Sequence, residues 1–283
     1  MNHSLTASSP VSKRLSPRKM AFITGTLLLT STGFICRILG FFYRIFMSRT
    51  IGAEGLGIYN MVHPIFSICF AVCAGSIQTA LSQYVAANQT RGRAVFRTGL
   101  VIAMGMSFLL AWVIYGNAGF LAEKLLLEPR CAPYLPVMAV SVPFAALHAC
   151  INGYYYGMQK ARVPAFSQVA EQVIRMGAVF LIASIWLESG RQITVSLAVY
   201  GHLIGEMASA VFTVFCLGFF PPCKDGDSRR APAIPLSFGA TAAPLMALAL
   251  PLMGNRLILN VLGSAEAIWI PNRLMSSGLT NSE

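Results

Sequence analysis

The residues with the clearest chemical potential are arginines inside an apolar segment. Residues 33–49 read GFICRILGFFYRIFMSR and carry Arg37, Arg44 and Arg49. A charge at the centre of a membrane helix costs roughly 2.5 to 3.5 kcal/mol even on the gentlest scale. Such residues persist where they line water or hold an anion. The segment therefore suggests a polar surface within a membrane-spanning helix.

Arg37 and Arg44 fall on one face of the predicted helix, because seven residues turn it only about 20° short of two full turns. The same stripe holds Thr26, Thr30, Gly33 and Ser48, and the opposite one Leu28, Ile35, Leu39, Phe42 and Phe46. Arg37 lies near the midpoint of the apolar run 20–48. Arg44 lies on the order of 10 Å nearer its outer end, so snorkelling to the interface explains Arg44 more easily than Arg37.

Three more apolar runs carry polar residues. Glu171 and Arg175 have the i, i+4 spacing of an intrahelical ion pair, which would either neutralise itself or contact substrate. His202 and Glu206 share that spacing. They could couple transport to protons or ions, although a buried hydrogen-bonded pair is the interpretation that we favour. Arg256 lies on a later apolar run beside Asn255 and, one turn on, Asn260.

The composition places these residues in a membrane protein. The chain has 283 residues, of which 55% are hydrophobic and only 11% charged, whereas soluble domains carry about 25% charged residues. Seven runs are long enough to span a bilayer: 20–48, 57–85, 95–117, 133–157, 165–187, 193–220 and 237–262. They are continuous, unlike the alternating strands of a barrel. We predict an all-α polytopic membrane protein with about seven transmembrane helices.

Basic residues in the gaps predict the orientation. Twelve lie in the N-terminal tail and in the gaps after the second, fourth and sixth runs, against four in the alternate gaps. The N-terminus is therefore expected in the cytoplasm. Aromatic residues are expected to anchor the helix ends, with Trp112 and Tyr115 outside and Tyr154 to Tyr156 inside.

An internal similarity suggests a repeat. Residues 44–60 and 256–272 align at an offset of 212 with five identities in seventeen, Arg44 with Arg256 among them. Chance similarity between two apolar segments is the alternative. We expect a basic cytoplasmic tail (1–19), a first six-helix repeat (20–220), a cytoplasmic linker (221–236) and the start of a second repeat (237–283), with the last helix followed by an outer loop. Either the chain is truncated, and the missing C-terminal half is then expected to be required for activity, or it is a half-sized version of a larger protein.

Signatures of other functions are missing from the sequence. There is no HExxH, G-x-S-x-G or P-loop motif, so no enzyme activity is expected. The net charge of +11 is not gathered on one polar face, which argues against nucleic-acid binding. His63, His148 and His202 are too dispersed along the chain to indicate a metal site, and no cofactor is expected.

Three segments resemble the stage V sporulation protein B-like proteins of the MATE-like flippase superfamily, to which the lipid II flippase MurJ belongs. They are CRILGFFYRIFMSRTIGAEGLGIYNMVHP (36–64), NGYYYGMQKARVPAFSQVAEQVIR (152–175) and NRLILNVLGSAEAIWIPNRL (255–274). The resemblance implies two six-helix bundles around a cavity that opens alternately to each side of the bacterial cytoplasmic membrane. It also implies a lipid-linked saccharide of the undecaprenyl diphosphate type as the substrate, and membrane lipid as surroundings.

In that family pattern, cavity arginines hold the diphosphate, for which a bidentate guanidinium is well suited. Arg37 falls on such a position, whereas the second position falls on Tyr43, one residue before Arg44. Arg37, with Arg44 and Arg256 as further candidates, is the expected binding set. Two alternatives remain: a cation-coupled drug antiporter using Glu171 and Glu206, and a non-transporting scaffold for envelope assembly.

Overall fold

The computed structural model describes the backbone of residues 17–222 and 238–276, and the side chains of residues 20, 23–222 and 238–263. Most of the predicted tail and linker, with Lys224, Arg229 and Arg230, lies outside the described residues, as does the chain after Ser276. Within the described ranges the chain is helical, without strands.

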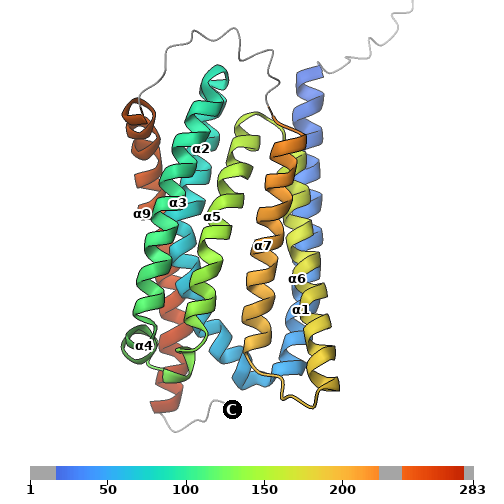
Figure 1. Ribbon diagram of the computed structural model, residues 1–283, viewed down its shortest axis with the longest axis vertical. Coiled ribbons are helices and arrows are strands. Elements are labelled where there is room, and N and C mark those ends of the chain that lie inside the picture. The colour runs from blue at the N-terminus through green and yellow to red at the C-terminus, as the bar shows by residue number, and fades with distance from the viewer. Residues whose placement is uncertain (1–16, 223–237, 277–283) are drawn as a thin grey trace, which may run out of the picture.

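The main helices run antiparallel along the long axis of the molecule (Figure 1). They are α1 (Pro17–Phe70), α2 (Ser76–Ala87), α3 (Gly92–Gly116), α5 (Leu135–Gly157), α6 (Arg162–Glu188), α7 (Ser196–Phe219) and α9 (Phe238–Ser276). A π-helix (Ala71–Gly75) continues α1 into α2. Short elements fill the connections: 3₁₀ turns at Gln89–Arg91 and Pro129–Cys131, α4 (Ala118–Phe120) and a π-turn (Leu121–Leu125).

A glycine divides the first long helix into two crossing segments. Gly52 has φ 74° and ψ 173°, a conformation that glycine adopts more readily than any other residue. The continuous stretch Ile23–Ala87 has 65 residues, roughly three times what a 30 Å hydrocarbon core requires. The break lets the chain turn back, so that the six apolar helices supply seven crossing segments.

Two predicted helix boundaries were wrong. The sequence predicted a loop over 49–56, but helix continues on both sides of Gly52, and the last helix runs to Ser276 rather than 262. The turn is held by Arg130, which pairs with Glu54 and donates from Nε to Oε1 of Glu128 at 2.8 Å. Hydrogen bonding from Arg130 holds the pKa of Glu128 below its usual value.

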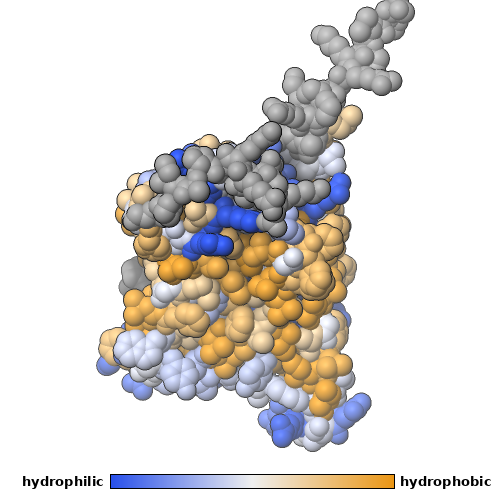
Figure 2. Space-filling model, turned by 45° about the horizontal axis from the view of Figure 1, so that its top comes forward, coloured by the Kyte–Doolittle hydropathy of each residue, from blue (hydrophilic) through white to orange (hydrophobic). Residues whose placement is uncertain are grey.

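The surface matches a membrane protein. Figure 2 shows an apolar band across the visible face of the molecule, with hydrophilic residues gathered toward its two ends. Large apolar side chains such as Phe34, Phe41, Trp112 and Val211 are exposed on the outer helix faces. The chain is an all-α polytopic membrane protein, as predicted.

Two hydrophobic clusters hold the helices together. The larger is built mainly by the second part of α1 with α2, α3, α5 and α9, around residues such as Val62, Leu81 and Met138. The smaller joins the first part of α1 to α6 and α7 through Met47, Val179 and Leu197. The cluster of ionisable side chains described below lies where α5 meets α6 and α7.

The expected tyrosine anchors at the end of α5 are packing residues instead. Tyr154 and Tyr155 are only 2% and 1% exposed. Tyr154 stacks on Phe96 with ring centroids 4.8 Å apart. The Tyr155 hydroxyl donates toward the carbonyl oxygens of Cys216 and Phe220, at 2.9 and 2.8 Å, and so caps the C-terminal end of α7.

Replacing Tyr155 with phenylalanine should therefore lower the free energy of unfolding by about 0.5 to 1.5 kcal/mol, because a buried hydrogen bond to the end of α7 is lost. The quantity can be measured by denaturant unfolding in detergent micelles. Tyr156→Phe, in the half-buried neighbour, is the matched control and should change it by less than about 0.5 kcal/mol. Equal effects of the two changes would contradict the capping role.

Candidate functional site

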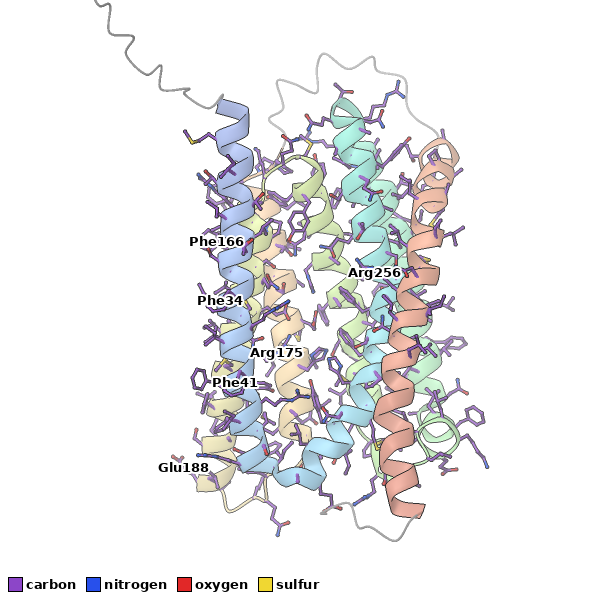
Figure 3. All side chains as sticks on the ribbon, turned by 180° about the vertical axis from the view of Figure 1, so that it is seen from behind. Phe34, Phe41, Phe166, Arg175, Glu188 and Arg256 are labelled. Atoms are coloured by element: carbon purple, nitrogen blue, oxygen red, sulfur yellow. The ribbon has the colours of Figure 1, made fainter. Side chains whose placement is uncertain are left out.

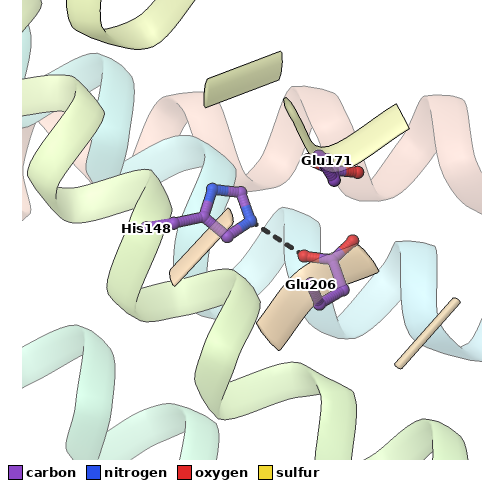
Figure 4. A group of neighbouring side chains, drawn as sticks. All are labelled: His148, Glu171 and Glu206. Atoms are coloured by element: carbon purple, nitrogen blue, oxygen red, sulfur yellow. Dashed lines mark hydrogen bonds and ion pairs between the residues drawn. The ribbon is translucent and has the colours of Figure 1, made fainter. Parts of the chain in front are cut away.

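Ionisable side chains meet at the middle of the bundle, on three neighbouring helices. His148 lies near the midpoint of α5, Arg175 at that of α6 and Glu206 near that of α7. Glu171 lies one turn from Arg175 on α6. Figure 4 shows His148 and Glu206 joined across the interface between α5 and α7, with Glu171 beside them. We call these four residues the charged cluster.

The charged cluster forms a continuous chain of contacts. Arg175 and Glu171 form the intrahelical ion pair that their spacing predicted. The same Arg175 Nη2 lies 3.8 Å from Oε1 of Glu206. His148 Nε2 lies 2.8 Å from Oε2 of Glu206, within hydrogen-bonding distance. Glu206 is therefore the junction between the guanidinium and the imidazole, and its side chain is only 7% exposed.

The predicted hydrogen-bonded pair of His202 and Glu206 was wrong. His202 Nε2 is 3.9 Å from Oε1 of Glu206, which is too long for a hydrogen bond. Both ring nitrogens are buried without a hydrogen-bond partner among the described residues. The ring instead packs edge-on against Phe66, at 4.4 Å between centroids, and near His63. His148, from another helix, is the residue that bonds Glu206.

Close packing of α6 on α7 brings Arg175 to Glu206. At Gly205 a side-chain carbon would lie 2.7 Å from Nε of Arg175, so only glycine leaves room for the arginine there. Gly201, one turn earlier, meets Val179 in the same way. One turn later, Ser209 and Ser167 share a 2.8 Å hydrogen bond. Small residues at four-residue spacing are typical of tightly packed membrane helices.

Polar residues of α1 border the charged cluster. Tyr43 is half-buried, and its hydroxyl has no hydrogen-bond partner among the described residues. Tyr59 and His63 follow on the second part of α1, with ring centroids 5.7 Å apart. Buried polar atoms without partners are uncommon in folded proteins, and Nδ1 of His148 and Nε of Arg175 add to them. Packing between helices does not require these polar groups, so their concentration here marks the region as a candidate site.

One of the three histidines, His148, lies in a group of side chains whose spacing would suit a metal ion. His148, Glu171 and Glu206 offer ligand atoms that all lie within 4.8 Å of one another. Arg175 shares this space, however, and its guanidinium pairs with both carboxylates. The positive charge of Arg175 would repel a divalent cation bound at these ligand atoms. The group is therefore better suited to a ligand with a single positive charge than to a divalent metal ion.

The arginines of the first helix lie elsewhere. Arg37 and Arg44 are both exposed, on a face of α1 that points away from the other described helices. Thr30 and Ser48 of the same stripe are exposed as well. Phe34 and Phe41 project from α1 at the edge of the molecule (Figure 3). Thr32, Met47 and the half-buried Tyr43 make up the bundle-facing side of the helix.

Arg256 is placed differently from Arg37 and Arg44. It lies on α9, which stands at the opposite edge of the bundle from the first part of α1 (Figures 1 and 3). Its Nη2 donates to Oγ1 of Thr79 at 3.0 Å, and its guanidinium lies against Gly75 at the end of the π-helix. A guanidinium has five N–H donors, so this bond leaves donors for another partner.

The sequence interpretation assigned no site role to His148, Tyr43, Tyr59 or His63. The depth argument applied to Arg37 would have flagged His148, since it lies near the midpoint of an apolar run. The small-residue pattern G201-x-x-x-G205-x-x-x-S209 would have marked the face of α7 that packs on α6.

Comparisons with known proteins agree with the membrane architecture. A family model described as polysaccharide biosynthesis protein matches residues 22–278. Stage V sporulation protein B of Bacillus subtilis is 29% identical over 267 residues, which cover 92% of this chain and 51% of that protein. Lipid II flippase MurJ of the same organism is 23% identical over 206 residues, covering 67% of this chain and 38% of that protein.

Sporulation protein YkvU of Bacillus subtilis is 18% identical over 262 residues, covering 92% of this chain and 57% of that protein. The chain thus spans about half the length of the curated relatives that it matches. No solved structure matches it significantly.

Proposed function

The chain belongs to the polysaccharide biosynthesis protein family, and on that premise we propose that it is part of a flippase for a lipid-linked saccharide. The substrate would carry an undecaprenyl diphosphate or a similar group, and the site of action would be the bacterial cell membrane. The relative named lipid II flippase supports this class of substrate. The chain would contribute recognition of the diphosphate.

One observation carries the proposal: Arg37 is exposed at the middle of a membrane-spanning helix, on a face without a described helix against it. A guanidinium in contact with lipid tails would be strongly unfavourable. A diphosphate would offset that cost through paired charge-assisted hydrogen bonds. We propose that Arg37 is the main ligand of the diphosphate, that Arg44 assists nearer the outer end, and that Arg256 contributes from α9.

The proposed topology follows the distribution of charge. The N-terminus would lie in the cytoplasm, residues 20–220 would form the first of two six-helix bundles, and α9 would begin the second after the linker 221–236. The arginine face of α1 would then border a cavity between the bundles. A saccharide headgroup would cross through that cavity as the bundles rock against each other.

The structure gives less support to a drug antiporter that binds cations at Glu171 and Glu206. Both carboxylates pair with Arg175, and Glu206 also contacts His148. A cationic drug would have to displace the guanidinium. The arginine face, in contrast, is exposed and positive, which suits an anionic substrate.

Cysteine labelling separates a cavity from a scaffold surface. A cysteine at Thr30, on the arginine stripe, should react with a membrane-impermeant maleimide, because water reaches that side of a transport cavity. A cysteine at Phe42, 58% exposed but about 120° away from Thr30 around the helix, should stay unlabelled in lipid. The labelling of each variant is measured as the increase over the labelling of the wild-type protein, which carries the native cysteines. Protection at both positions would favour the scaffold.

A further inference from the structure

The charged cluster has an imbalance of charge that points to a bound proton. Arg175 contributes one positive charge, and Glu171 and Glu206 contribute two negative charges. Their side chains are only 17%, 20% and 7% exposed. A net negative charge buried at the middle of a membrane helix bundle is strongly unfavourable. One further positive charge would make the cluster neutral.

His148 is placed to carry that charge. Its Nε2 lies 2.8 Å from Glu206 Oε2, whereas the guanidinium of Arg175 pairs directly with Glu171 and lies farther from Glu206, at 3.8 Å. We propose that the charged cluster is a site for one exchangeable proton, held between His148 and Glu206, and that Arg175 is its movable counter-charge. This rests on the proposed transport function, for which proton exchange would supply the driving force.

Other ionisable groups around His148 do not supply the missing charge. His202, one turn before Glu206 on α7, lies 3.9 Å from it without a hydrogen bond, and His63 packs against His202. Tyr43 and Tyr59 face the site from α1 and are neutral at ordinary pH. Arg44 of α1 acts electrostatically on Tyr59, but it is exposed and forms no ion pair with either carboxylate among the described residues.

Loss of the proton has a defined structural consequence. The proton on the imidazole passes to water, His148 becomes neutral, and Glu206 loses its cationic partner. Arg175 Nη2 lies 3.8 Å from Glu206 already, so a small shift would let it bridge both carboxylates. The cluster would then carry one net negative charge, which is tolerated only when water reaches it. Release is thereby tied to a more open conformation, and the compact arrangement seen here is the proton-loaded one.

Nuclear magnetic resonance of labelled histidines tests the proposal without any transport assay. The chain has four histidines, and ring ¹⁵N shifts distinguish imidazolium from neutral imidazole. The His148 signal is assigned by its loss in His148→Gln. In the wild-type protein at neutral pH, His148 should be imidazolium. In the Glu171→Gln variant, His148 should be neutral at the same pH, although the contact between His148 and Glu206 is untouched. The reason is that Glu206 is then the one carboxylate left in the cluster, and Arg175 balances its charge.

Adding Arg175→Gln to the Glu171→Gln variant should restore the imidazolium, since Glu206 again lacks a counter-charge. Glu188→Gln, at the exposed end of α6, is the matched control and should leave the signal unchanged. A neutral His148 in the wild type, or an imidazolium retained in Glu171→Gln, would overturn the proposal. The His63 and His202 signals report whether each variant is folded. Failure here would leave diphosphate binding by Arg37 untouched, and loss of that binding would not alter these spectra.

Discussion

Replacing Arg37 with alanine is expected to weaken the binding of undecaprenyl diphosphate at least tenfold. Charge-assisted hydrogen bonds contribute about 1.5 to 3 kcal/mol each, and about 1.4 kcal/mol corresponds to a factor of ten. Lysine at this position should give an intermediate affinity, because an ammonium is a point charge without the bidentate geometry of a guanidinium. Native mass spectrometry of the detergent-solubilised chain can measure the affinities.

The control for Arg37 is Arg191→Ala. Arg191 is likewise exposed, but it lies in the connection between α6 and α7 rather than within a span. Its removal should change the affinity by less than about twofold, because exposed charges outside the site are screened by salt. Arg44→Ala should fall between the two variants. An equal loss of affinity in the Arg37 and Arg191 variants would show that only the overall charge of the protein matters, and it would contradict a specific role for Arg37.

Arg175→Gln should be the most destabilising single change in the charged cluster. It leaves Glu171 and Glu206 buried with no guanidinium, and breaking a buried pair in this way costs about 3 to 5 kcal/mol. The free energy of unfolding in mixed detergent micelles measures the loss. Arg162→Gln, an exposed arginine at the start of α6, should change it by less than about 0.5 kcal/mol.

Charge balance makes a second, opposite prediction for the same residue. Adding Glu171→Gln to Arg175→Gln removes the carboxylate that has lost its partner, while Glu206 keeps His148, so the double variant should regain about half of the lost stability or more. A purely steric role for Arg175, filling the space over Gly205, predicts no recovery. Destabilisation that is equal in the single and double variants would therefore contradict the electrostatic interpretation of this cluster.

Local patterns allowed much of this fold to be predicted from sequence. The seven apolar runs correspond to the observed crossing segments. A segment in lipid must satisfy its backbone hydrogen bonds internally and therefore forms a helix, so an apolar run of sufficient length predicts one. The Glu171–Arg175 pair was also predictable, since both residues lie on one helix face, one turn apart. A break between the first two runs was predicted, but as a loop over 49–56; polar residues such as Arg49 and Glu54 interrupt the apolar run there, whereas the backbone stays helical on both sides of Gly52.

Contacts between helices could not be predicted in the same way. The contact between His148 and Glu206 joins residues 58 positions apart, and it depends on how α5 and α7 are rotated and packed. Helical periodicity places His202 on the same helix face as Glu206 but does not say whether its ring turns toward the carboxylate or toward Phe66. Likewise, the spacing of Arg37 and Arg44 places them on one face without saying which neighbour that face meets.

The affinity of the chain for three lipids that share one tail tests the proposed function most directly. Undecaprenyl diphosphate, undecaprenyl monophosphate and the uncharged alcohol would each be titrated into the wild-type protein in nanodiscs. Recognition through Arg37 predicts the tightest binding for the diphosphate, an intermediate value for the monophosphate, and at least a tenfold weaker value for the alcohol. Equal affinity for all three lipids would show that the tail alone is bound and would contradict a diphosphate site on this chain.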